Sequence, residues 1–72
     1  MKLYFLQHIE TKQLACFYKD SFDEISVIDY SEHEPVFCHS RHSDVAAVLE
    51  HNHHYIWSTL NKRDYQIIER VV

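Results

Sequence analysis

The chain has 72 residues, a formal net charge of −4 and a hydrophobic content of 46%. This length predicts a single domain over residues 1–72, and the hydrophobic content argues against a disordered chain. No apolar run reaches the roughly 18 residues of a membrane-spanning helix, and the first residues predict a strand instead of a signal peptide, so we expect a cytoplasmic protein with no membrane partner.

Apolar residues at alternate positions predict several strands, and a polar connection joins the first two as a hairpin. Residues 25–30 have two interpretations: their β-branched residues favour another strand, whereas the capping-box pattern from Ser21 to Glu24 favours a short helix. Pro35 marks a turn after this region. The remaining predicted strands cover residues 2–9, 14–18, 36–39 and 64–72.

The stretch from Ser43 to Leu60 combines a helix start, a helical apolar pattern and a helix stop. Ser43 is a good N-cap, Asp44 suits the positive end of the helix dipole, and Asn61 suits a left-handed position after the last turn. Asn52 interrupts the apolar face among weak helix formers. We therefore expect a helix over about residues 43–60. A break near Asn52 would divide it into segments over about 43–51 and 54–60.

These elements predict an α+β fold in which one main helix packs on one face of a mostly antiparallel sheet of four to five strands. The predicted order is β-β-(β)-β-α-β. Most aromatic residues, Trp57 included, are expected in the core or at its edge, and Cys16 and Cys38 are expected to be free thiols. The predicted core between sheet and helix consists of Leu3, Phe5, Cys16, Val48, Leu49, Leu60 and Ile67.

Histidine is the most unusual feature of the composition, with seven residues, of which all but His8 lie between positions 33 and 54. Imidazole and carboxylate groups are ligands that zinc accepts, and residues three or four apart on a helix are neighbours. The chain has no CxxC or HExxH motif, so ordinary surface histidines are the leading interpretation. A zinc site is the alternative, and its candidate ligands are His42, Glu50, His51 and His54.

Acidic residues are concentrated in the middle of the chain. Residues 20–40 contain six acids and no Lys or Arg, whereas the remainder contains five acids and seven bases. This asymmetry suits a basic protein partner, and the acidic balance argues against direct binding of nucleic acid. The candidate partner-binding residues are Asp20, Asp23, Glu24, Asp29, Glu32 and Glu34.

The leading functional hypothesis is a small non-enzymatic protein-interaction module, of accessory or regulatory type, such as phages and mobile elements carry. The absence of glycine excludes the usual phosphate-binding loops and nucleophile elbows, and it forces turns to use Asn, Asp, Ser, Thr, His or Lys. A transition-metal-binding protein is one alternative. A minor enzyme that pairs Cys38 with His39 or His42 is the other.

The last predicted strand also suggests self-association. Residues 64–72 are largely apolar and have only Glu69 and Arg70 to discourage pairing along an exposed edge. We therefore expect a two-fold homodimer, against the alternative of a monomer in which this strand lies in mid-sheet.

Overall fold

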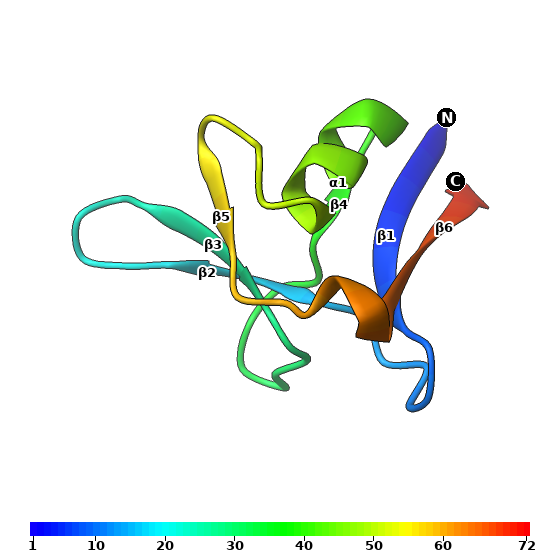
Figure 1. Ribbon diagram of the computed structural model, residues 1–72, viewed down its shortest axis with the longest axis horizontal. Coiled ribbons are helices and arrows are strands. Elements are labelled where there is room, and N and C mark those ends of the chain that lie inside the picture. Colours follow the sequence, from blue (N-terminus) through cyan, green and yellow to red (C-terminus); the bar gives the residue numbers. More distant parts are fainter.

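Two three-stranded sheets and one α-helix form the fold in the computed structural model, which describes residues 1–72 (Figure 1). The expected α+β class is confirmed, but the strands divide between the sheets β4-β1-β6 and β2-β3-β5 instead of forming one sheet. The elements are β1 (Lys2–His8), β2 (Cys16–Lys19), β3 (Ile25–Ile28), β4 (Cys38–His39), α1 (His42–Leu49), β5 (Ile56–Ser58), the 3-10 helix η1 (Lys62–Asp64) and β6 (Tyr65–Val71).

Each sheet is built around a central strand. β1 pairs antiparallel with β4 and β6, while β3 pairs antiparallel with β2 and parallel with β5. Ala15 connects the sheets, because its N–H donates to Leu6 O at 2.8 Å and its carbonyl accepts from the N–H of Phe37 at 2.9 Å. The predicted hairpin of the first two strands is confirmed only at the antiparallel bridge between Gln7 and Leu14, because beyond it β2 pairs with β3 in the other sheet.

The helix is shorter than predicted. It covers His42–Leu49, its N-cap is Arg41 and not Ser43, and no side chain caps its first turn. His51 takes the left-handed conformation expected at Asn61, with φ of 61°, and turns the chain away from the helix. The predicted helical turns over residues 54–60 are wrong, because β3 offers Ile56–Ser58 a parallel partner.

Residues 25–28 form a strand, so the helical interpretation of this region is wrong. The capping-box sequence lies instead in the turn between β2 and β3. There Asp20 Oδ1 accepts from the N–H groups of Phe22 and Glu24 at 2.8 and 3.0 Å, and Asp23 has a positive φ of 63°. The aspartate therefore satisfies donors that would otherwise begin a helix.

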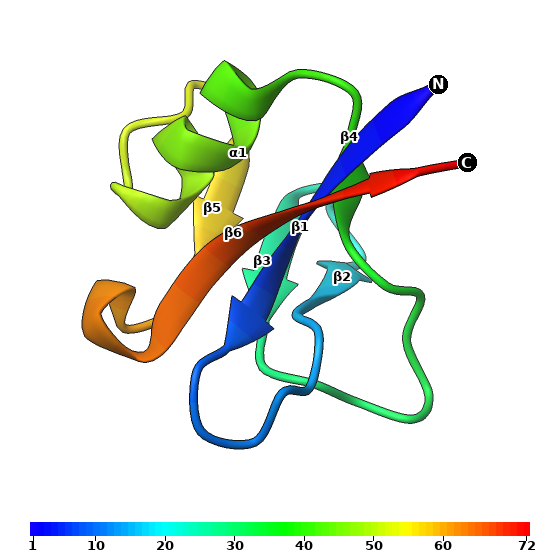
Figure 2. The same cartoon turned by 90° about the vertical axis from the view of Figure 1, so that its right-hand side faces the viewer.

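Helix α1 packs on the face of sheet β4-β1-β6 that carries Leu6 (Figure 2). The predicted placement of Leu3 and Phe5 in this core is wrong, because both are only half-buried on the opposite face of β1. Ile67 packs against the core, and Cys16 is buried outside the core cluster. The cluster comprises Leu6, Ala15, Val27, Phe37, Val45, Val48, Leu49, Leu60 and Tyr65.

The structure contains no helix that is both long enough and apolar enough to span a membrane. Its one α-helix has eight residues.

Leu6→Ala should lower the free energy of unfolding by about 2–5 kcal/mol, because Leu6 is fully buried and its truncation leaves a cavity. The matched variant Leu3→Ala lies on the half-buried face of the same strand and should cost less than about 1.5 kcal/mol. Urea denaturation of both variants measures the difference. A larger loss for Leu3→Ala would contradict this orientation of β1.

Candidate functional site

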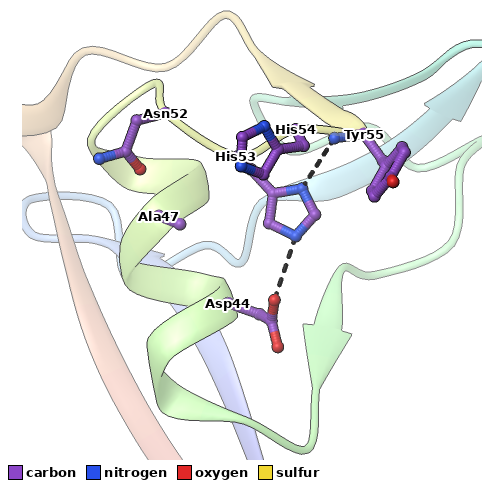
Figure 3. Close-up of a pocket in the computed structure, with 6 residues that line it drawn as sticks. All are labelled: Asp44, Ala47, Asn52, His53, His54 and Tyr55. Carbon is purple, nitrogen blue, oxygen red and sulfur yellow. Dashed lines mark hydrogen bonds and ion pairs between the residues drawn. The ribbon is translucent and has the colours of Figure 1, made fainter.

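The segment after helix α1 forms two adjoining hollows on the surface. His53 lines both of them, and it comes from the loop between α1 and β5 (Figure 3). The larger hollow has a volume of about 340 Å³ and is lined by Asp44, Ala47, Asn52, His53, His54 and Tyr55. The smaller has a volume of about 170 Å³ and is lined by His51, His53, Ile56, Trp57 and Ser58.

Both nitrogens of the His53 ring are engaged. Its Nδ1 accepts hydrogen bonds from the backbone N–H groups of Tyr55 and Ile56, each at 3.1 Å. Its Nε2 lies 3.2 Å from Asp44 Oδ1 (Figure 3). Since Nδ1 accepts, the proton of the neutral ring is on Nε2 and is donated to Asp44. The hydrogen bonds of this ring thereby link the start of β5 to the first turn of the helix.

This arrangement leaves His53 without a free lone pair for a metal ion or a substrate proton. His39 lies on the other side of Asp44, with its Nδ1 3.7 Å from Asp44 Oδ2. That Nδ1 accepts from the N–H of Arg41 at 3.0 Å, so it holds the turn before the helix. The Asp44 carboxylate therefore lies between two imidazoles whose Nδ1 atoms bind the backbone.

A third histidine has the same role at the opposite end of the molecule. His8 Nδ1 accepts from the N–H groups of Glu10 and Thr11 at 3.2 and 3.3 Å. Its ring packs edge-on against Tyr65, with the ring centroids 5.2 Å apart. Histidine thus takes the role that Asn, Asp or Ser usually has in turns, where the side chain accepts a hydrogen bond from the backbone N–H of the residue two positions later. The absence of glycine predicted that His would be among the turn residues, but nothing in the sequence indicated which histidines take this role.

The four candidate zinc ligands do not gather in the structure, and no group of three or more His, Cys, Asp or Glu residues could hold a metal ion. The reason is that the helix ends before His51, which removes the expected helical spacing. His42 packs edge-on against Tyr4, Glu50 pairs with Lys62, and His51 Nε2 donates to Leu60 O at 2.8 Å. His54 is exposed on the rim of the larger hollow.

The predicted enzymatic pair is not assembled either. His39 uses its Nδ1 for the turn at Arg41, and His42 lies against Tyr4 with the ring centroids 5.4 Å apart. Cys38 is a half-buried free thiol with no side-chain hydrogen bond, and Cys16 is also free.

The six candidate partner-binding acids fall into two groups, one before and one after β3 in the chain. Asp20, Asp23 and Glu24 lie in the turn between β2 and β3, at the tip of the hairpin that projects in Figure 1. The other three follow β3. After the loop that follows β3, the chain returns beside β2, because Phe17 N–H donates to Pro35 O at 2.8 Å, so Glu34 lies near β2 and not at the far end of β3. The second group consists of Asp29, Glu32 and Glu34.

Four of these acids already have a partner within the chain. Asp20 caps its own turn, Asp23 pairs with Lys19 at 3.4 Å, and Glu32 lies 3.7 Å from His33. Asp29 accepts a hydrogen bond from the hydroxyl of Tyr65. The carboxylates that have no such partner are those of Glu24 and Glu34.

The face of sheet β2-β3-β5 that points away from the core carries two exposed aromatic residues. Tyr18 pairs with Ser26, and Ser26 pairs with Trp57, so the three lie in one row across the sheet. Tyr18 is 44% exposed and Trp57 is 63% exposed. The expected core position of Trp57 is therefore wrong, because the predicted helix that would have buried it is an edge strand.

No protein-family model, curated protein or solved structure matches this chain.

His53→Ala should lower the free energy of unfolding by about 1–3 kcal/mol, because two backbone donors lose their acceptor. His53→Asn should cost less, since an Asn oxygen can still accept the N–H of Tyr55. The control is His54→Ala, which removes an exposed ring without a hydrogen bond and should change stability by less than about 0.5 kcal/mol. Equal losses for His53→Ala and His54→Ala, measured by urea denaturation, would refute this role.

Tyr65 should make stability fall at alkaline pH. Burial raises the pKa of Tyr65, and the hydrogen bond to Asp29 raises it further. Because the folded pKa exceeds the unfolded value of about 10, the stabilisation is complete below that pH and is lost as pH rises toward the folded pKa.

The measurement is chemical denaturation from about pH 8 to about pH 11, where the unfolded-state phenol ionises. The control is Tyr65→Phe, which keeps the ring without the titrating hydroxyl and should show a shallower decline. The same decline in both proteins would show that Tyr65 is not responsible.

Proposed function

We propose that this protein is a small interaction module that binds a basic segment of a partner protein across the outer face of sheet β2-β3-β5. The observation that carries the proposal is the exposed row of Tyr18, Ser26 and Trp57, on a sheet whose central strand β3 has an acidic group before it and another after it in the chain.

The aromatic row suits a cationic side chain. Adjacent strands are about 4.8 Å apart, so Tyr18 and Trp57 flank Ser26 at a Cα separation of roughly 10 Å. The small Ser26 leaves room between the two larger side chains. An Arg or Lys side chain placed over Ser26 would meet both rings, and each cation–π contact at an exposed site contributes about 0.5–1 kcal/mol.

The surrounding charge favours the same partner. Residues 20–40 carry six acids and no Lys or Arg. The single base of the hairpin, Lys19, is paired with Asp23 at 3.4 Å. Glu24 and Glu34 have no intramolecular partner, so they are free to meet the cations of a bound segment. Such exposed charges raise the association rate and select the sign of the partner more than they raise affinity.

A cytoplasmic location belongs to the same proposal. Both cysteines are free thiols, as expected of a protein in a reducing compartment.

The test is titration with a peptide of about twelve residues, with Arg at alternate positions to match the period of an extended strand. Trp57 is the only tryptophan of the chain, so its fluorescence reports directly on the proposed surface. We expect a dissociation constant of about 10–100 μM at low salt, corresponding to several weak contacts. Raising the ionic strength to about 0.5 M should abolish the fluorescence change, because exposed charges are screened.

Matched variants locate the binding. Glu24→Gln and Glu34→Gln should each weaken binding by roughly two- to threefold, whereas Glu10→Gln, which makes the same charge change in the turn between β1 and β2, should not. Tyr18→Ser should weaken binding further through loss of one ring. Equal fluorescence changes with a peptide that carries Glu in place of Arg would refute the proposal.

A further inference from the structure

β6 is the longest strand at the edge of either sheet, and its unpaired backbone groups can be identified. At the two ends of the β1–β6 ladder, Val72 N–H donates to Met1 O and Ile9 N–H donates to Asp64 O, each at 2.8 Å. The register between these ends is continuous. Hydrogen-bonded pairs alternate along an antiparallel ladder, so the residues of β6 bonded to β1 are Gln66, Ile68 and Arg70.

The residues between them direct their N–H and C=O groups away from β1, toward the free edge. These are Ile67, Glu69 and Val71. None of the three has a backbone hydrogen bond outside the regular elements. Charged residues, proline and bulges usually protect such an edge, but the only proline of the chain is Pro35, and the register of β6 contains no bulge.

We propose that β6 pairs antiparallel with β6 of a second copy, about a two-fold axis that places the two Ile68 residues opposite each other. In this register Ile67 of each copy faces Glu69 of the other. All four residues direct their donors and acceptors toward the partner strand, so each pair makes two hydrogen bonds. Sheet β4-β1-β6 of one copy then joins the same sheet of the other copy to form one six-stranded sheet.

Neighbouring registers are less favourable. An axis at Glu69 or at Arg70 would place like charges directly opposite each other. An axis at Ile67 would require the N–H of Tyr65, which already donates to Lys62 O. The axis at Ile68 opposes no like charges, and its two central pairs of Ile67 with Glu69 form without the N–H of Tyr65.

The outer face of the sheet supports the same axis. Cys38, Phe5 and Ile68 are in register across β4, β1 and β6, and all three are half-buried. With Ile68 opposite itself, this apolar row continues without interruption into the second copy. The proposal is independent of the proposed function, which uses the other sheet.

Cysteine cross-linking tests the register. Ile68→Cys and Arg70→Cys are each placed in a Cys38→Ser background and exposed to a mild oxidant. Opposed residues that are not hydrogen-bonded have Cα atoms about 4.5 Å apart, within the range of a disulfide, so Ile68→Cys should form a covalent dimer. Arg70 of one copy is offset from Arg70 of the other by four positions, or roughly 13 Å. The Arg70→Cys variant should therefore remain monomeric on denaturing gels.

Light scattering supplies the second measurement. The unmodified chain should show twice the monomer mass of 8.7 kDa at about 100 μM. This high concentration is needed because a small interface at a sheet edge binds weakly. Glu69→Pro removes an N–H that points only toward the second copy and should give the monomer mass with unchanged circular dichroism, whereas Glu69→Ala keeps the N–H and the dimer. A monomer mass for the unmodified chain, or equal cross-linking at positions 68 and 70, would overturn the proposal.

Discussion

The absence of glycine is the constraint on which the rest of this structure depends. Many reversals of the chain use either a left-handed residue or a side chain that accepts a backbone N–H. Three non-glycine residues, Lys12, Asp23 and His51, take the left-handed conformation. At eight other positions a side chain accepts the N–H two residues on: His8, Thr11, Asp20, Ser31, His39, His53, Ser58 and Asn61.

This constraint changes how the high histidine content of the chain is interpreted. A high histidine content first indicates metal or proton chemistry, but three of these rings use Nδ1 to hold turns. His51 uses its Nε2 to hold the carbonyl of Leu60, and His42 packs on Tyr4. An imidazole engaged in this way shapes the backbone and has no lone pair to offer a ligand at the same atom. The histidine content is therefore best explained by architecture.

The division into two sheets leaves two separate surfaces open. The outer face of β2-β3-β5 carries the exposed aromatic row, and β6 carries unpaired backbone groups at the edge of the other sheet. In so small a domain, the single core formed by Leu6 of β1, Val27 of β3 and Val45 of the helix uses the inner faces of both sheets. The outer faces therefore lie outside the core.

The sequence by itself determined the α+β class, the first and last strands, the start region of the helix and the burial of Val48, Leu49 and Leu60, because local periodicity and burial agree there. Only the tertiary structure decided the end of the helix, since the parallel partner β3 draws Ile56–Ser58 into a strand against the helical spacing. It also decided which face of β1 is buried, because both faces are apolar and alternation cannot distinguish them. The exposure of Trp57 and the pairing of Asp44 with His53 follow from the early end of the helix.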